Sequence, residues 1–155
     1  PGNIFQTDQI AGAEYGVYHA NTPLVLVLGH SDCGAVNAAV ALETNRMQHK
    51  LERNIPRLLT PVCAMVRRAL AEHPEMSKEE LVDYCVRENV YAEISNLFLG
   101  SASVREAAAA GKIKVAGAIY DLKSGQVKRL DGERVAQLLK EAQASDRRET
   151  QALAD

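Results

Sequence analysis

Two apolar runs stand out along the chain, and each has the length of a β-strand. The first extends from Leu24 to Leu28 without a polar residue, and the second extends from Ile113 to Tyr120 with a single charge. Runs with so little polar alternation are typical of strands that are covered on both faces of a sheet. The turn residues Ser124-Gly125 and the short run from Gln126 to Leu130 follow the second strand, so we expect a β-hairpin there.

The other segments carry helical spacing and helix-end signals. Ser77-x-x-Glu80 is a capping box, Thr7 or Asp8 is a candidate N-cap, and Gly111 is a favourable C-terminal cap. The polar and charged tail beyond Ser145 has little to bury, so we expect it to be loose. The predicted helices extend from about Asp8 to Ala20, from Gly34 to about Leu42, from about Ile55 to Glu72, from Ser77 to about Leu99, from after Gly100-Ser101 to Ala110, and from Asp131 to Ala142.

This order of elements predicts an α/β fold with a mostly parallel sheet flanked by helices. Two long strands are few for a complete parallel sheet, so we expect that the first strand is missing and would precede Pro1. The 155 residues suit one domain with a substantial core. No linker divides the chain, and we predict a single domain over residues 2–142 and a polar C-terminal tail over residues 143–155.

Composition and charge argue against several classes of partner. The formal net charge is -2 and no long basic run is present, so we expect neither nucleic acid nor a membrane surface as a partner. No apolar stretch approaches the ~20 residues of a membrane span, and the first residues do not resemble a signal peptide. Three widely spaced cysteines do not form a disulfide framework, which indicates a reducing, cytoplasmic location.

The candidate chemistry lies directly after the first apolar run, in the segment from Gly29 to Gly34. His30 stands at the end of the strand, and the first residues of the next helix can bring Cys33 back toward the same point. Imidazole and thiolate are both good zinc ligands, and the carboxyl end of a buried strand is where open α/β sheets place their sites. The structural alternative is that Cys33 is a small buried hydrophobe and His30 a hydrogen-bonded turn residue.

The remaining cysteines and histidines favour structural roles. Cys63 and Cys85 lie in predicted helices, and we expect both to be buried thiols. His19, His49 and His73 are expected at the surface or at helix ends rather than as ligands. A redox role for Cys33 is the second choice of chemistry, because no other cysteine stands at Cys-x-x-Cys spacing from it.

The segment around His30 and Cys33 resembles the zinc motif of the β-class carbonic anhydrases. The similarity extends in the family's order over about residues 2 to 142, which is far more specific than His-x-x-Cys alone. The matching segments are Gly29–Val36, Gly2-Asn3, Ala13–Val17, Glu88–Val90, Gly117–Leu122 and Ser124-Gly125.

The resemblance implies a zinc enzyme that interconverts carbon dioxide and bicarbonate, assembled as a homodimer or homotetramer. By position, His30 and Cys33 would be the second and third protein ligands of Zn²⁺, and Gly34 would line the substrate pocket. Zinc would lower the pKa of a bound water so that hydroxide can attack carbon dioxide near neutral pH. A zinc hydrolase acting on carbonyl sulfide or carbon disulfide would use the same metal core.

The sequence departs from the family in one respect. The family's first zinc cysteine and its Asp–Arg dyad lie in an upstream Cys-x-Asp-x-Arg segment that has no counterpart here, so no catalytic residue is identified. One interpretation is a part of an ordinary active enzyme. The other is a degenerate, inactive homologue that serves as an oligomerisation or small-anion-binding module. Cys63, Cys85 or a partner subunit are alternative sources of the missing ligand.

Overall fold

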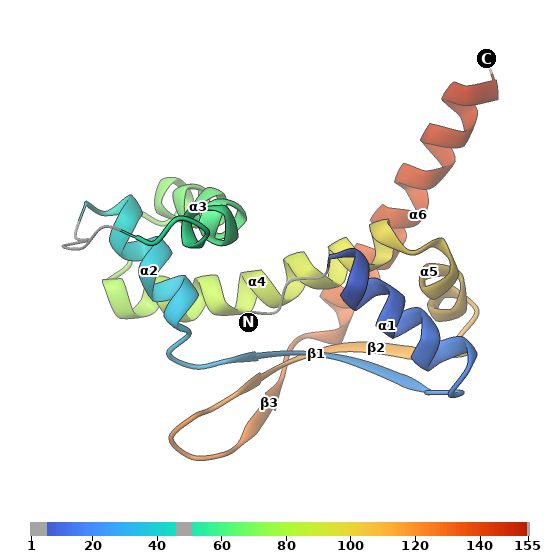
Figure 1. Cartoon of the computed structure of the whole chain (residues 1–155), viewed down its shortest axis with the longest axis horizontal. Coiled ribbons are helices and arrows are strands. Elements are labelled where there is room, and N and C mark those ends of the chain that lie inside the picture. The colour runs from blue at the N-terminus through green and yellow to red at the C-terminus, as the bar shows by residue number, and fades with distance from the viewer. Residues whose placement is uncertain (1–5, 46–50, 155) are drawn as a thin grey trace.

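The computed structural model describes residues 6–45 and 51–154 (Figure 1). Gly2-Asn3 and His49 therefore lie outside the described residues. Within the described ranges no helix is long and apolar enough to cross a membrane. The elements are α1 (Thr7–Tyr18), β1 (Leu24–His30), α2 (Gly34–Glu43), α3 (Ile55–Glu72), α4 (Lys78–Gly100), α5 (Ala102–Ala109), β2 (Lys114–Tyr120), β3 (Val127–Arg129) and α6 (Gly132–Ala154).

The α/β class is confirmed, with a small mixed sheet in the order β1-β2-β3. β1 and β2 are parallel, in a register that pairs Leu24 with Lys114 and His30 with Tyr120. β3 runs antiparallel to β2 and confirms the predicted hairpin. Among the described residues β1 pairs on one side only, so it forms an edge of this sheet.

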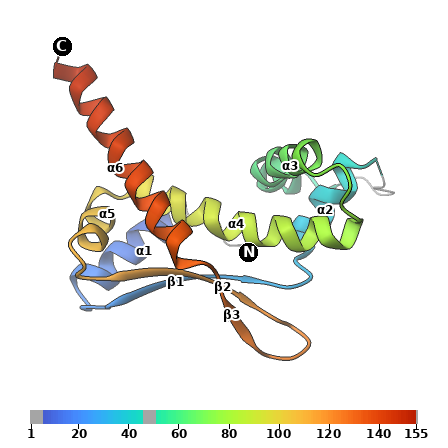
Figure 2. The ribbon, with the colours of Figure 1, turned by 180° about the vertical axis from the view of Figure 1, so that it is seen from behind.

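One face of the sheet is covered by helices, and the views agree that α4, α5 and α6 lie on the same side of the strands (Figures 1 and 2). On the covered face an added Cβ at Gly117 would lie 2.9 Å from Val90 Cγ1 of α4, which is too close for any larger residue. The opposite face of β1 carries Leu24, Leu26 and Leu28, which we call the leucine strip.

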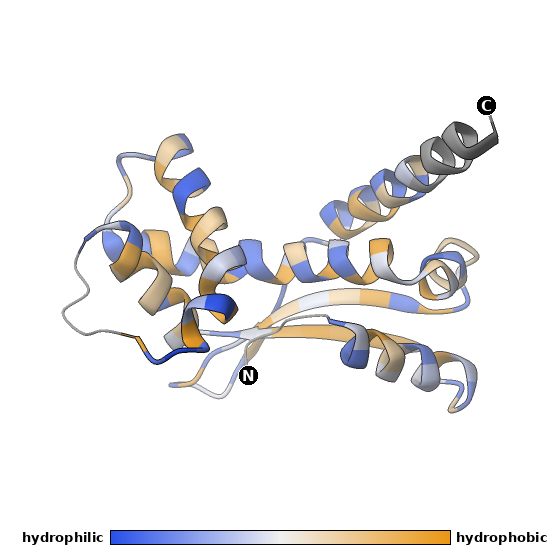
Figure 3. Cartoon of the chain, turned by 45° about the horizontal axis from the view of Figure 1, so that its top comes forward, coloured by the Kyte–Doolittle hydropathy of each residue, from blue (hydrophilic) through white to orange (hydrophobic). Residues whose placement is uncertain are grey.

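The leucine strip corrects a prediction. Its side chains are exposed by 45%, 45% and 43%, so the first apolar run is covered on one face rather than on both. Val27, the neighbour that points to the other face, is only 3% exposed. Figure 3 shows β1 as hydrophobic along most of its length. The cause is that the helices packed on β1 and β2 come from one side of the sheet in the described chain.

The hydrophobic interior is divided into two cores that share helix α4. The helical core lies between α2, α3 and the first half of α4, and it includes all three cysteines. The sheet core lies between β1, β2, the second half of α4, α5 and α6. Ile119 of β2 packs against both cores. The 23 residues of α4 are about 34 Å long, enough to span the two cores.

Most predicted helix ends are confirmed. Ser77 Oγ accepts a hydrogen bond from the Glu80 N–H, and the Glu80 carboxylate accepts one from the Ser77 N–H. Gly111 follows α5 with a φ of +70°, the left-handed conformation expected of a C-terminal cap. The N-cap of α1 is Gln6, so the prediction of Thr7 or Asp8 was wrong by one or two positions.

The predicted end of the last helix at Ala142 was also wrong. α6 continues to Ala154, through most of the tail that was expected to be loose. Residues 143–154 contain neither glycine nor proline and are rich in Ala, Gln, Arg and Glu, all of which have favourable helix propensity. Low apolar content indicated that the tail has little to bury, but it did not exclude a helix.

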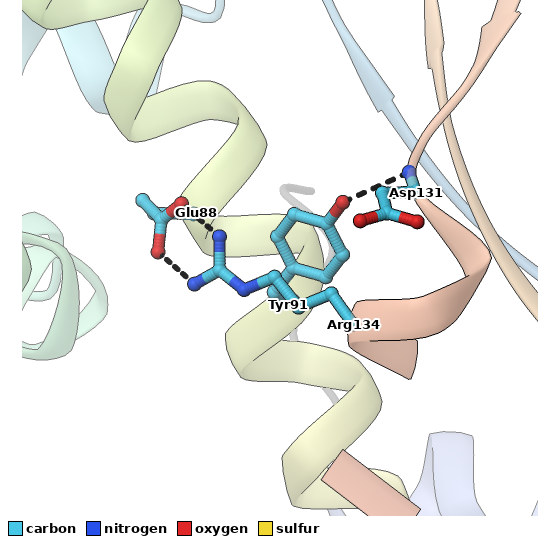
Figure 4. Close-up of polar contacts among 4 residues, drawn as sticks. All are labelled: Glu88, Tyr91, Asp131 and Arg134. Atoms are coloured by element: carbon cyan, nitrogen blue, oxygen red, sulfur yellow. Dashed lines mark hydrogen bonds and ion pairs between the residues drawn. The ribbon is translucent and has the colours of Figure 1, made fainter. Parts of the chain in front are cut away.

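The start of α6 is attached to α4 by one arginine (Figure 4). Arg134 forms a two-pronged ion pair with Glu88, with Nη1 2.6 Å from Oε1. Its guanidinium also lies over the Tyr91 ring, 4.1 Å from the centroid. The Tyr91 hydroxyl accepts a hydrogen bond from the Asp131 N–H at 3.0 Å. The hydrogen bonds that Arg134 donates to Glu88 raise the pKa of Arg134, so the guanidinium keeps its charge.

Candidate metal centre

The predicted ligands His30 and Cys33 lie between β1 and α2 and are separated by Ser31 and Asp32, the two residues that we call the link. His30 is the last residue of β1, and Cys33 is the N-cap of α2. His30 thus belongs to the end of the sheet, whereas Cys33, 9% exposed, is part of the helical core. The pair stands at the carboxyl ends of the two parallel strands, where the two cores meet.

The His30 ring is oriented by the backbone. Its Nδ1 lies 2.9 Å from the Ser31 carbonyl oxygen. Because a carbonyl oxygen can only accept, Nδ1 must carry the hydrogen of this bond. In the neutral ring Nε2 then has the lone pair, which is the arrangement commonly found for metal-binding histidines.

The link itself is tied to the sheet through Ser31. The Ser31 N–H donates to the Tyr120 carbonyl oxygen at 2.9 Å, and this bond continues the parallel ladder by one residue. The Ser31 hydroxyl accepts a hydrogen bond from the Leu122 N–H, also at 2.9 Å. Asp32, the next residue, has a φ of +53° in the left-handed region. The backbone therefore turns sharply between the two candidate ligands.

Gly34, the predicted pocket residue, is the first residue of α2. An added Cβ at this position would meet no atom within 4 Å, so the space beside it is open. A separate polar cleft of about 480 Å³ opens beside the link, between Asp32, Asn37, the start of α4 and the β2–β3 turn. Neither His30 nor Cys33 is among the residues that line this cleft. The assignment of Gly34 to a substrate pocket stays a prediction.

Comparisons with known proteins identify the family of this chain. A family model described as carbonic anhydrase matches residues 1–127. The chain belongs to the β-carbonic anhydrase family. It is 29% identical over 126 residues to carbonic anhydrase 2 of Mycobacterium tuberculosis, a match that covers 81% of this chain and 57% of that protein.

Solved structures agree with this membership of the β-carbonic anhydrases. The β-carbonic anhydrase CafA of Aspergillus fumigatus superposes with a TM-score of 0.74 at 28% identity, covering 92% of this chain and 66% of that one. One of two tetrameric β-carbonic anhydrases of Sordaria macrospora matches with a TM-score of 0.66 at 26% identity, covering 82% and 62%. The chain spans about half the length of the curated relatives that it matches.

The donor types in this β-carbonic anhydrase chain fit zinc, although the described residues supply only two of them. Imidazole nitrogen and thiolate sulfur are the ligands that zinc prefers. Within residues 6–45 and 51–154, no group of three or more His, Cys, Asp or Glu side chains is placed to hold a metal ion. The assignment of His30 and Cys33 as two of the metal ligands therefore stays a prediction.

The other cysteines have the properties of buried thiols, as predicted. Cys63 and Cys85 are free and buried. Burial, together with hydrogen bonding and charge from Glu43, raises the pKa of Cys63. Burial raises the pKa of Cys85 to about 11. In the absence of a metal, both thiols therefore keep their protons near neutral pH.

The histidines predicted to lie at helix ends do so where the structure describes them. His19 is the C-cap of α1, and its ring stacks on Tyr15. His73 is the C-cap of α3 and packs edge-on against Tyr84. Neither lies in the link between β1 and α2. The sequence reasoning missed Asn37, whose side chain contacts this link and is considered below.

Proposed function

We propose that the protein to which this chain belongs catalyses the zinc-dependent, reversible hydration of carbon dioxide to bicarbonate. The observation that carries the proposal is the link between β1 and α2, where a β-carbonic anhydrase chain presents His30 with a free Nε2 three residues before Cys33. When bound, zinc would supply an acidified water as the nucleophile. A carbonyl sulfide or carbon disulfide hydrolase is the nearest enzymatic alternative, because it would use the same metal core.

The residues of this chain would bind and orient. His30 would donate its Nε2 lone pair, because the Ser31 carbonyl oxygen holds the hydrogen on Nδ1. Cys33 would donate its sulfur from the edge of the helical core. Gly34 would leave room for the substrate, since no side chain fills the space beside it. The third protein ligand and the Asp–Arg dyad of the family would come from residues other than those described.

We further propose that the working form is a homo-oligomer in the cytoplasm. The leucine strip supports an assembly, because a soluble chain rarely leaves three neighbouring large apolar side chains of one strand in water. The Sordaria macrospora relatives are described as tetrameric. Three free cysteines, all buried, suit a reducing compartment.

A degenerate, inactive homologue that serves in oligomerisation or small-anion binding is the second candidate. The incomplete ligand set among the described residues is the observation that favours it.

Elemental analysis of the purified protein, followed by a carbon dioxide hydration assay, separates the two candidates. We expect about one zinc per chain. The zinc should be lost in His30→Ala and Cys33→Ser and retained in the control His19→Ala, which changes an exposed helix-cap histidine. Folded protein without zinc and without hydration activity would establish the inactive module instead. Zinc without carbon dioxide hydration would direct the assay to carbonyl sulfide and carbon disulfide.

A further inference from the structure

The side chain of Asn37 holds the link between the two candidate ligands. Asn37 lies in the first turns of α2 and is half-buried. Its Nδ2 donates to Asp32 Oδ1 at 3.0 Å and to the Cys33 carbonyl oxygen at 3.2 Å. A side-chain amide has two N–H groups, so one nitrogen can make both bonds together.

Asp32 needs such a contact more than an ordinary residue does. Its φ of +53° is a left-handed conformation that costs a non-glycine residue of the order of 1 kcal/mol. Aspartate tolerates it when its short side chain finds a nearby hydrogen-bond partner, and Asn37 provides that partner. Without this bond, the backbone at Asp32 can relax toward other conformations and carry Cys33 with it.

The link is thus fixed from both sides. Ser31 is attached to β2 and to Leu122 by two hydrogen bonds, which holds the His30 end to the sheet. The Asn37 side chain attaches Asp32 to α2 and adds a second hydrogen bond to the Cys33 carbonyl oxygen, which also accepts from the Asn37 backbone N–H at 2.9 Å, so the other end is held to the helical core.

We propose that Asn37 is a positioning residue that sets the place of the Cys33 sulfur relative to His30. The part of this inference that concerns metal rests on the proposed function, whereas the part that concerns the link does not. Groups that orient metal ligands commonly change metal affinity by 10- to 100-fold when they are removed. Helix propensity does not explain an asparagine at position 37 of α2, because alanine has the higher propensity.

Asn37→Ala tests the proposal in metal-free protein. The variant removes both side-chain hydrogen bonds but improves helix propensity, and because these effects oppose each other we expect only a small change in the thermal midpoint. After chelator treatment, alkylation of Cys33 by iodoacetamide should be at least several-fold faster than in the wild type. Peptide mass spectrometry reports Cys63 and Cys85 in the same sample, and their rates should not change because they lie in α3 and α4, outside the hydrogen bonds that Asn37 makes.

Cobalt(II) provides the second readout. We expect Asn37→Ala to weaken cobalt binding by about tenfold or more and to shift the thiolate-to-cobalt charge-transfer band. Asp32→Asn is the matched conservative variant, since an asparagine at position 32 still accepts from Nδ2 and tolerates a positive φ. Its alkylation rate and cobalt spectrum should resemble those of the wild type.

Asn37→Asp removes the donor and places a second carboxylate beside Asp32, so it should loosen Cys33 at least as much as Asn37→Ala does. The double variant Asp32→Asn with Asn37→Asp restores the bond between the two side chains in the reverse direction. It does not restore the bond to the Cys33 carbonyl oxygen, which a carboxylate cannot make. Partial rescue is therefore expected.

An unchanged Cys33 alkylation rate in Asn37→Ala would overturn the proposal. Faster alkylation of all three cysteines together with a lower thermal midpoint would overturn it as well, because that pattern indicates general loosening. If the wild-type protein binds no cobalt but Asn37→Ala still releases Cys33, the positioning role stands and the proposed zinc function fails. The two hypotheses are thus separated by one set of samples.

Discussion

The two hydrophobic cores differ in how completely the described residues enclose them. The helical core closes on itself between three helices, with Val40 and Val66 fully buried. The sheet core is enclosed on one face, while the leucine strip on the other face of β1 remains 43–45% exposed. The helices α2, α3 and α4 are sufficient to enclose the helical core. In the sheet core, helices cover only one face of the sheet. The other face is also apolar and is suited to burial by a further layer.

The largest expected effect concerns the covered face, where helix and sheet are closest. Gly117→Val would drive methyl groups into Val90 and Ile94, because even a Cβ would lie 2.9 Å and 3.2 Å from their nearest carbons. We expect a loss of about 3 kcal/mol or more in the free energy of unfolding, measured by urea denaturation.

Ala116→Val is the matched control for Gly117→Val, because Ala116 pairs with Leu26 and its side chain lies on the leucine-strip face. We expect a change below about 1 kcal/mol, since valine suits a strand and that face has room. Equal losses in the two variants would mean that the faces do not differ as described.

A second pair of variants tests the same contrast within β1. Val27→Ala removes two methyl groups from a side chain that is 3% exposed, and we expect a loss of about 2 kcal/mol. Leu26→Ala changes the next residue, which is 45% exposed, and should cost less than about 1 kcal/mol in dissociated protein. Unfolding measured at several protein concentrations sharpens the comparison.

If a second copy covers the leucine strip, the cost of Leu26→Ala grows with protein concentration while that of Val27→Ala stays constant. A concentration-independent cost of about 2 kcal/mol for Leu26→Ala would show that the strip is covered within one chain.

The contrast also explains which features the sequence could predict. Strands, helices and the His30–Cys33 pair follow from local patterns: apolar runs, capping boxes and ligand spacing. The open face of β1 could not be predicted, because the apolar residues Leu24, Leu26 and Leu28 indicate burial, whereas the described elements leave them 43–45% exposed. The apolar content of a strand predicts that its side chains are buried. Only the arrangement of the elements shows whether other residues cover them.

Asn37 illustrates a different limit. An asparagine five residues after an aspartate is not a recognised motif, and its hydrogen bond to Asp32 crosses a turn at which Asp32 has a positive φ. The sequence around His30 and Cys33 predicts the ligands, whereas the residue that orients one of them follows from backbone geometry. Supporting contacts of this kind are therefore found after the fold is known.

The smallest expected effect belongs to the helical core and appears only at alkaline pH. Burial raises the pKa of Cys85 from 9.0 to about 11, because its thiol is fully enclosed and the thiolate would be poorly solvated. A raised pKa means that the folded protein retains the proton more strongly than the unfolded chain. The stability from this group is present in full below pH 9 and is lost as the pH rises toward 11.

We expect wild-type protein to lose about 1 kcal/mol from this source by pH 10. Cys85→Ala removes the titrating group, so its free energy of unfolding should fall less steeply between pH 8 and about pH 11 than that of the wild type. Cys63 also has a raised pKa, but it is present in both proteins and cancels in the difference. The pKa of Tyr84 is raised mainly by burial and in small part by charge on Cys85, so its contribution to the pH dependence should also decrease in Cys85→Ala, in the same direction. If the free energies of unfolding of the two proteins depended on pH in the same way, water would have access to Cys85 in the helical core. The two cores would then differ less in enclosure than the burial of their side chains implies.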